Sequence, residues 1–159
     1  MADLLIFIPT YNEKENITWL YEQIKALNLA NDLLFIYDGS PDGTGDVIQS
    51  LVDKDESVFL IRRPAKNGIG SAHKVGVDWA YKRGYKKLLT MDADHTHSPN
   101  DIPKLLSAAE KYDVVLGSRY VNENSLEGWN IFRKFLTFTG HLLTRVMLKL
   151  KYDATGAFR

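Results

Sequence analysis

Hydrophobic residues occur along this chain in two alternating patterns. Short continuous apolar runs are typical of buried strands, whereas stretches with an apolar residue every three or four positions are typical of helices that bury one face. The patterns predict strands at 4–8, 33–37, 58–62, 87–91 and 114–117, and helices at 14–27, 44–54, 70–83 and 99–112. This alternation predicts an α/β fold, in which a mostly parallel sheet is covered by helices on both faces.

Each predicted strand is followed at once by polar and turn-forming residues. These segments are 9–13, 38–44, 63–70, 92–94 and 118–120. The carboxyl ends of parallel strands meet along one edge of a sheet, and such folds bind their ligands there. Five polar segments are more than a stable α/β domain requires, so we expect a binding site at this edge.

Asp92 and Asp94 are the most informative pair of residues. Two carboxylates so close together repel each other unless a cation or a basic side chain lies between them. Their hard oxygen atoms suit Mg²⁺ or Mn²⁺, which would carry the diphosphate of a nucleotide-activated substrate. Thr96 or His97 would complete the coordination shell, although a hydrogen-bonded loop histidine explains His97 at least as well. A capping role for the aspartates is less favoured, because residues 98–100 already supply a helix cap.

The residues at the other strand ends indicate ligand contacts with unequal strength. Asp38 comes first after its strand, where its carboxylate can accept hydrogen bonds from a nucleobase or a ribose. A turn and a helix cap explain Asp42 and Thr44 equally well. Residues 66–72 resemble a phosphate-binding loop, because glycine lets backbone amides approach an anion, but the spacing differs from a Walker loop. Arg119 either forms a surface ion pair or binds a phosphate.

Bulk composition narrows the classes of function. The chain has 159 residues with 20 basic and 20 acidic side chains, so no global field favours nucleic acid. The absence of cysteine excludes disulfides, thiolate metal sites and a cysteine nucleophile. No apolar run reaches the roughly 18 residues that a membrane span needs. The apolar N-terminus lacks the basic region of a signal peptide, so we expect it to be a strand.

The stretch from 129 to 151 is basic and amphipathic. It contains no acidic residue, and its basic residues are Arg133, Lys134, Arg145, Lys149 and Lys151. Such a helix can lie in a membrane interface. A helix packed on the domain with a solvated basic face explains the composition equally well.

Together these segments resemble family 2 glycosyltransferases of the GT-A fold, and within that family the dolichol- or polyprenol-phosphate mannosyltransferases. The matching segments are 9–16, 38–44, 91–94, 117–120 and 153–159. Each segment alone is weak, but five of them in order, across the whole chain, are specific. The resemblance implies a Rossmann-like GT-A fold and an inverting transfer of a hexose, with mannose from GDP-mannose as the first choice, to a polyprenyl or dolichyl phosphate.

The resemblance also implies roles for individual residues. The donor nucleotide would contact Pro9, Tyr11, Glu13, Asp38, Lys66 and Asp92, and the divalent metal would be held by Asp92, Asp94 and Thr96. The catalytic residues would be Asp94, Arg119 and Arg133, with the two arginines holding the phosphate of the lipid acceptor. A phosphate acceptor is ionised at neutral pH and needs no strong base, whereas a sugar hydroxyl would need one, for which Asp153 is the candidate.

Two departures from the family pattern bear on these expectations. The family has two consecutive acidic residues where this chain has Tyr37 and Asp38. Because neighbouring strand side chains point to opposite faces, Asp38 can keep its role while Tyr37 packs elsewhere. Family members also continue beyond Arg159, so we expect a catalytic-domain fragment. Its nucleotide-sugar-binding core would be 1–128, and 129–159 would form an acceptor-side segment, peripheral at the cytoplasmic face of the membrane.

Three other readings compete with this one. A family 2 transferase acting on a saccharide hydroxyl is the rival within the enzyme class, and the basic stretch favours the lipid acceptor over it. A nucleotide-sugar-binding module without turnover is the second. A receiver-type signalling domain also places acidic residues at strand ends, but Arg119 and the metal-spaced aspartates fit it poorly.

Overall fold

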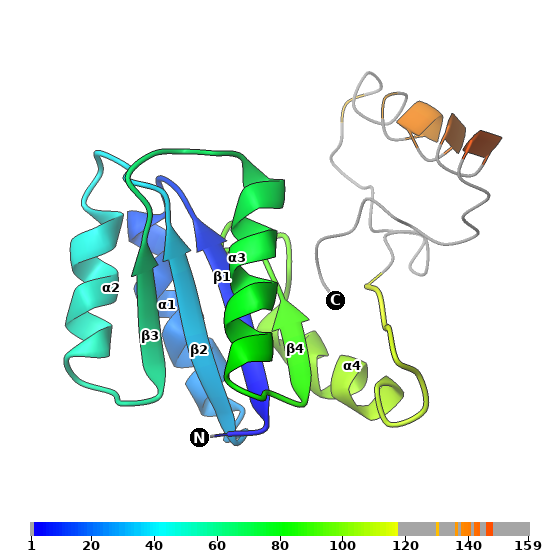
Figure 1. Ribbon diagram of the computed structural model, residues 1–159, viewed down its shortest axis with the longest axis horizontal. Coiled ribbons are helices and arrows are strands. Elements are labelled where there is room, and N and C mark those ends of the chain that lie inside the picture. Colours follow the sequence, from blue (N-terminus) through cyan, green and yellow to red (C-terminus); the bar gives the residue numbers. More distant parts are fainter. Residues whose placement is uncertain are drawn as a thin grey trace.

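The computed structural model describes residues 2–117, 130, 136, 138–140, 142–143 and 146–147. Its sheet contains β1 (Leu4–Thr10), β2 (Asn31–Tyr37), β3 (Val58–Arg62) and β4 (Lys87–Thr90). The strands lie in the order β3-β2-β1-β4, and every pairing is parallel (Figure 1). The helices are α1 (Lys14–Ala26), α2 (Thr44–Val52), α3 (Ile69–Lys82), the 3₁₀ turn η1 (Pro99–Asp101) and α4 (Ile102–Ala108). The predicted parallel α/β architecture is confirmed.

Two hydrophobic cores lie on opposite faces of the sheet. The larger core joins the strands to α1, α2 and α4, with Ile17, Leu20 and Ile24 of α1 buried at helical spacing. The smaller core joins the strands to α3, which lies in front of the sheet in Figure 1 while α1 lies behind it. Helices therefore cover both faces, as the sequence predicted.

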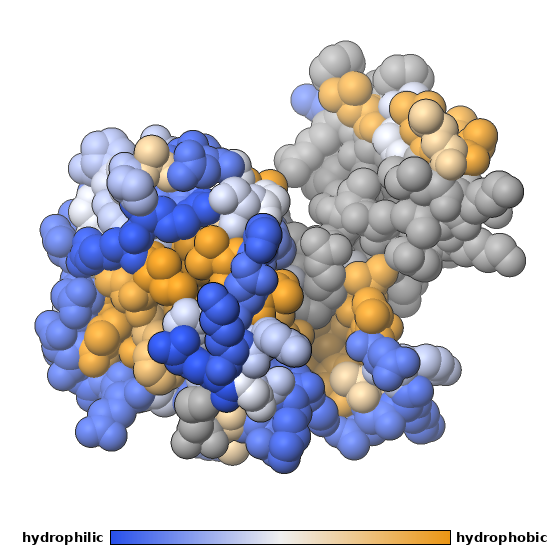
Figure 2. Space-filling view, viewed as in Figure 1, coloured by the Kyte–Doolittle hydropathy of each residue, from blue (hydrophilic) through white to orange (hydrophobic). Residues whose placement is uncertain are grey.

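The helix α3 approaches the sheet through small residues. Its buried positions are Ala72, Gly76 and Ala80, spaced four residues apart on one side of the helix. A Cβ atom on Gly76 would lie only 3.0 Å from the ring of Phe7, so a larger residue would push α3 off β1. Among the described residues, α3 is the helix that packs on this face, and apolar surface is visible beside it over β2 and β3, where Phe59 and Ile61 are only partly buried (Figure 2).

The predicted strand at 114–117 is wrong. These residues have no regular secondary structure, and Val114 is 72% exposed. Val114 and Val115 instead line a hollow of about 580 Å³ beside β4, α3 and α4. A β-branched apolar run satisfies the sequence pattern of a strand, but a strand also needs a ladder partner, and within the described residues this run pairs with none. The predicted helix at 99–112 is also shorter, because it starts as η1 and α4 ends at Ala108.

The division of the chain at residue 128 stays a prediction. Most of 129–159 lies outside the described residues, and those described between 136 and 147 are helical. Within the described part of the chain, no helix has the length and apolar character needed to cross a membrane.

Candidate functional site

The loops that follow β1, β2, β3 and β4 lie at the same edge of the sheet, because the four strands are parallel (Figure 1). This edge carries the described residues that the sequence assigned to a site: Pro9, Tyr11, Glu13, Asp38, Lys66, Asp92, Asp94 and Thr96. A hollow of about 570 Å³ lies there, lined by residues 12–16 with Pro41 and Asp42. The predicted gathering of strand-end residues is therefore present, and its individual contacts define what the edge can do.

Asp38, directly after β2, forms a buried ion pair with Arg63, directly after β3. The guanidinium Nε and Nη2 atoms each donate to one oxygen of the Asp38 carboxylate at 2.5 Å, and only 9% and 8% of the two side chains are exposed. The remaining Nη1 atom of Arg63 donates to Ser71 at the start of α3. Sequence reasoning placed Asp38 in the site but missed Arg63, although an arginine at the carboxyl end of a strand was itself a usable signal.

Tyr37 points away from Asp38 and packs against α2. Its hydroxyl donates to the carbonyl oxygen of Ser40 at 2.6 Å, and the guanidinium of Arg62 lies 5.6 Å from its ring centre. A Cβ atom on Gly45 would lie 2.8 Å from both the Tyr37 ring and the Arg62 guanidinium, so glycine at this position lets α2 sit close to the two side chains. The tyrosine thus fills the α2 side of β2 and makes no contact that competes with the Asp38–Arg63 pair.

Tyr11 and Lys66 come together above the sheet edge. The Lys66 ammonium lies 4.0 Å from the centre of the Tyr11 ring, which is a favourable cation–π distance. The two residues belong to the loops after β1 and β3, and both were predicted to contact the nucleotide. Two glycines after Lys66, Gly68 and Gly70, have open space where a Cβ atom would lie. The backbone of this loop is therefore accessible to a ligand.

Asp42 ties together the N-termini of two helices. Its carboxylate accepts a hydrogen bond from the backbone of Lys14 in α1 and others from the backbone and hydroxyl of Thr44 in α2. The Thr44 hydroxyl in turn accepts from the backbone amide of Glu13. Burial raises the pKa of Asp42, but these hydrogen bonds outweigh burial and hold the pKa well below its usual value. These contacts agree with the turn interpretation of Asp42 and Thr44, but the N-cap residue of α2 is Gly43, so neither residue is the cap that the sequence suggested.

The loop after β4 folds around its own polar groups. Asp94 accepts hydrogen bonds from the hydroxyl of Thr96 at 2.6 Å and from its backbone amide at 3.2 Å. The Nδ1 atom of His97 accepts from the backbone amide of Asp92 at 2.9 Å. His97 thus holds the loop, which is the hydrogen-bonded role considered for it, while Thr96 sits beside Asp94. The Ser98 side chain forms no cap hydrogen bond, so the cap expected from it is not present.

Negative charge accumulates at this edge of the sheet. The pKa of Glu13 is raised, first by burial and then by the charges of Asp94, Asp42 and Asp92, while a hydrogen bond from Asn16 opposes the rise. Within the described residues, neither Asp92 nor Asp94 forms an ion pair with a lysine or arginine. A cation placed between these carboxylates would relieve their mutual repulsion.

The residues that could hold a metal ion supply two carboxylates, so a hard divalent cation here would also need an oxygen ligand that is not a carboxylate. The described residues contain no group of three or more His, Cys, Asp or Glu side chains arranged to hold a metal ion. Asp92 and Asp94 supply two carboxylates, and the Thr96 hydroxyl lies within hydrogen-bonding distance of Asp94. Oxygen atoms of this kind suit Mg²⁺ or Mn²⁺, which also keep water or substrate oxygens in their shell.

Three residues with predicted chemical roles, Arg119, Arg133 and Asp153, lie outside the described residues. The same holds for the basic residues Lys134, Arg145, Lys149 and Lys151 of the amphipathic stretch. The roles assigned to the donor-side residues stay predictions, and the acceptor side lies outside the described residues.

Known proteins resemble this chain along its length. An undecaprenyl-phosphate mannosyltransferase from Micrococcus luteus is 38% identical over 157 residues, which are 98% of this chain and 65% of that protein. A polyprenol monophosphomannose synthase from Mycolicibacterium smegmatis is 36% identical over 158 residues, 98% of this chain and 60% of that protein. This chain therefore spans less than two thirds of the length of either relative.

Solved structures support the fold. Glucosyl-3-phosphoglycerate synthase from Mycobacterium tuberculosis, solved with Mn²⁺, UDP and glucosyl-3-phosphoglycerate, superposes with a TM-score of 0.55 at 17% identity. The match covers 89% of this chain and 52% of that protein, and it confirms the predicted GT-A fold. Residues 5–159 also match the sequence profile of the family described as glycosyl transferase family 2. The chain therefore belongs to glycosyl transferase family 2, which confirms the predicted class of enzyme.

Proposed function

We propose that this chain is the catalytic part of an inverting transferase that moves a hexose from a nucleotide diphosphate sugar to a polyprenyl phosphate. The observation that carries the proposal is the sheet edge where Glu13, Asp92 and Asp94 gather without a lysine or arginine partner among the described residues. The relatives named as polyprenol- and undecaprenyl-phosphate mannosyltransferases support a lipid phosphate as acceptor and mannose as the sugar.

The donor nucleoside would lie across the loops after β1, β2 and β3. Tyr11 and Lys66 offer an aromatic face and a cation, and Asp38 offers carboxylate lone pairs that its pairing with Arg63 holds in a fixed direction. Pro9 and Glu13 line the same strand end. GDP-mannose is the expected donor, because the relatives transfer mannose according to their names.

The diphosphate of the donor would lie over the β4 loop. Asp92, Asp94 and Thr96 would hold Mg²⁺ or Mn²⁺ there, and the bound cation would neutralise charge that develops on the leaving diphosphate. Asp94 keeps its carboxylate directed by accepting two hydrogen bonds from Thr96. His97 fixes the backbone of Asp92, so both carboxylates are oriented before a ligand arrives.

The acceptor phosphate would approach the anomeric carbon from the face opposite the diphosphate. A phosphate oxygen forms the new bond to that carbon as the carbon–oxygen bond to the diphosphate breaks, so the configuration inverts and the nucleoside diphosphate leaves. Arg119 and Arg133 would bring the two anionic reactants together against their repulsion. The basic stretch from 129 to 151 would lie against an anionic membrane, which makes the enzyme peripheral at the cytoplasmic face.

A binding screen followed by a transfer assay tests this proposal. Calorimetry of GDP-, UDP- and dTDP-sugars with and without Mn²⁺ should select GDP-mannose, with tighter binding when Mn²⁺ is present. Incubation with radiolabelled GDP-mannose and a short polyprenyl phosphate should then move label into the organic phase. Label recovered only in water-soluble product would favour a saccharide acceptor, and metal-dependent binding without any transfer would favour a binding module.

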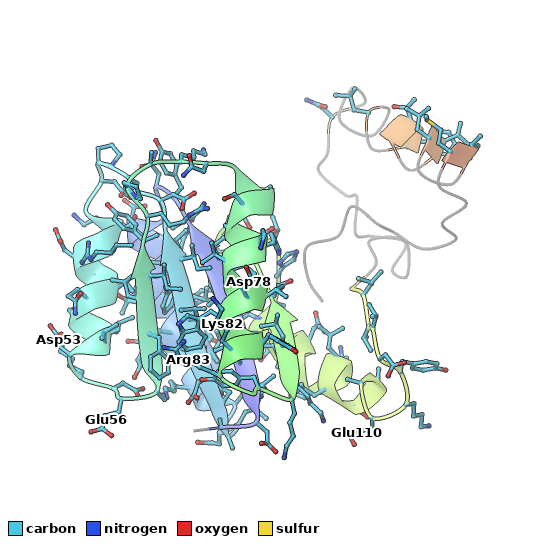
Figure 3. The ribbon with its side chains drawn as sticks, in the orientation of Figure 1. Asp53, Glu56, Asp78, Lys82, Arg83 and Glu110 are labelled. Atoms are coloured by element: carbon cyan, nitrogen blue, oxygen red, sulfur yellow. The ribbon has the colours of Figure 1, made fainter. Side chains whose placement is uncertain are left out.

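Matched variants separate the site from general effects of charge. Asp94→Asn keeps the shape of the side chain and should abolish the Mn²⁺ dependence of binding. Asp78→Asn is the control, because Asp78 is exposed on α3 and pairs only with Lys74 there (Figure 3). Equal loss of binding in both variants would count against a metal site at Asp94.

A further inference from the structure

The β4 loop contains a residue whose backbone is in an unusual conformation. His95, between Asp94 and Thr96, has a φ of 61°, and only two other non-glycine residues in the described part of the chain, Asn12 and Asn28, have positive φ. Residues other than glycine rarely adopt this left-handed region, so they remain in it only where neighbouring groups hold them. The contacts of the His95 side chain identify those neighbours.

Two residues of α1 hold the His95 ring. The ring centres of His95 and Trp19 lie 4.2 Å apart with the planes tilted by 57°, and the Nε2 atom of His95 lies 2.8 Å from Oδ1 of Asn16. Trp19 is 38% exposed, so its indole contributes little to the hydrophobic core and instead supplies a surface for the imidazole. The β4 loop is thus attached to α1 by one ring contact and one hydrogen bond.

Asn16 also reaches the loop that follows β1. Its Nδ2 atom donates to Oε2 of Glu13 at 2.7 Å. An ionised carboxylate can only accept, so the amide must turn its nitrogen toward Glu13 and its oxygen toward His95. The Nε2 atom of His95 then carries the hydrogen and donates it to Asn16. A directed chain of two hydrogen bonds runs from Glu13 through Asn16 to His95.

We propose that Asn16 and His95 are positioning residues that couple the nucleoside end of the donor site to the metal end. The inference rests on the proposed function, in which Glu13 contacts the nucleoside and Asp94 holds the metal. A bound nucleotide fixes the position of Glu13, and the hydrogen bonds through Asn16 and His95 then restrain the backbone of Asp94. A bound metal acts in the opposite direction, from Asp94 to Glu13. Because binding linkage is reciprocal, each ligand tightens the other by the same factor.

The first test measures this linkage directly. The affinity for Mn²⁺ is determined by electron paramagnetic resonance without nucleotide and with saturating GDP, in the wild type and in Asn16→Ala. The ratio of the two affinities should fall by about fivefold or more in the variant, which is a loss within the usual range of allosteric coupling. Direct contact between Mn²⁺ and the diphosphate is common to both proteins, so the difference in ratio reports the path through the protein. Thr18→Ala, an exposed change on the same helix, is the matched control.

The second test needs no ligand. Amide hydrogen exchange over residues 92–97 should quicken by about tenfold in Asn16→Ala and in His95→Asn, and should stay unchanged in Thr18→Ala. Asparagine tolerates positive φ, so His95→Asn removes the ring without imposing new backbone strain. The double variant should exchange no faster than either single variant, because both changes break one path.

The outcomes separate the two proposals. Unchanged exchange in Asn16→Ala would show that this contact does not hold the loop and would overturn the inference. Faster exchange with an unchanged linkage ratio would also overturn it, because the attachment would then be structural only. A wild-type protein that binds neither GDP nor Mn²⁺ would overturn the proposed function, and with it the coupling, whatever the exchange rates show.

Discussion

The two edges of the sheet treat their carboxylates in opposite ways. At the amino-terminal edge, Asp55 accepts hydrogen bonds from Lys25, Ser57 and Tyr21, and it forms an ion pair with Lys25 at 2.7 Å. At the carboxyl-terminal edge, Asp92 and Asp94 have no lysine or arginine partner within the described residues, and Asp92 lies 4.0 Å from Nδ1 of His97. The same kind of side chain thus fastens α1 to the start of β3 at one edge and remains available for a ligand at the other.

This contrast gives a physical criterion for function in a fold where acidic residues are common. A carboxylate whose lone pairs are filled by cationic and backbone donors stabilises the fold and has little capacity left for a ligand. A group of carboxylates that repel one another gains stability only when a cation arrives. Asp38 is the intermediate case, because it lies at the ligand edge and is paired with Arg63.

Breaking the Asp38–Arg63 pair should produce the largest change in stability. Arg63→Ala leaves the Asp38 carboxylate buried without its partner, and we expect a loss of about 3–5 kcal/mol in the free energy of unfolding, measured with urea. The control Arg83→Ala removes an arginine from the exposed face of Trp79 and should cost less than about 1 kcal/mol. Equal losses in the free energy of unfolding for the two variants would show that the buried pair does not stabilise the fold.

Asp94→Asn should have the next largest effect, on binding alone. We expect the affinity for a nucleotide diphosphate in the presence of Mn²⁺ to fall by about 100-fold, equivalent to about 2.7 kcal/mol. The midpoint of unfolding should stay within a degree or two in the absence of ligand, or rise, because a repelling charge is removed. A large loss of stability with unchanged binding would reverse the assigned roles of the two edges.

Asp55→Ala should show the opposite behaviour. It removes one carboxylate that serves four hydrogen-bond donors, so we expect a loss of about 2 kcal/mol in the free energy of unfolding, with donor affinity unchanged. Urea denaturation and calorimetry on the same preparation measure the two quantities. An altered donor affinity would mean that the two edges are not independent.

The pH dependence of stability should sharpen the comparison further. Burial raises the pKa of Asp55, but hydrogen bonds from Lys25, Ser57 and Tyr21 outweigh burial and depress the pKa well below its usual value. The stability that Asp55 provides is then fully present above its unfolded pKa of about 3.9 and is lost as the pH falls below that value. The wild type should therefore lose more stability than Asp55→Ala between pH 5 and pH 3, as followed by thermal unfolding. If the unfolding midpoints of the two proteins fall in parallel with pH, Asp55 does not contribute to the pH dependence of stability.

Much of this contrast could be predicted from the sequence, because it depends on periodicity and chain order. Apolar runs located the four strands within a few residues, and the order of strands and helices placed the polar loops at one edge. The failed strand at 114–117 shows the limit of the method, since pairing depends on a partner strand that local pattern does not contain. Arg63 was missed for a related reason: only the packed structure shows which carboxylate an arginine meets.

The contacts of His95 were equally hidden from sequence reasoning. Trp19 and His95 are separated by more than 70 residues, and no spacing rule connects a helix residue to a loop so far along the chain. His97 shows the same limit, because the sequence left open whether it is a ligand or a hydrogen-bonded loop residue, and its contact with the Asp92 amide is of the second kind. Residue type therefore predicted which side chains would gather, and the structure decided which of them hold the others.

The packing of Tyr37 against Gly45 has a consequence for how this chain can change over time. A Cβ atom at position 45 would lie 2.8 Å from the Tyr37 ring and 2.8 Å from the Arg62 guanidinium, so a larger residue there requires both side chains to shift. Among descendants of this sequence, we expect residue 45 to stay glycine while Tyr37 and Arg62 are both present, and alanine at 45 to follow only changes that remove both contacts. The tyrosine that stands in place of the family's acidic residue therefore limits which residues the neighbouring helix can carry.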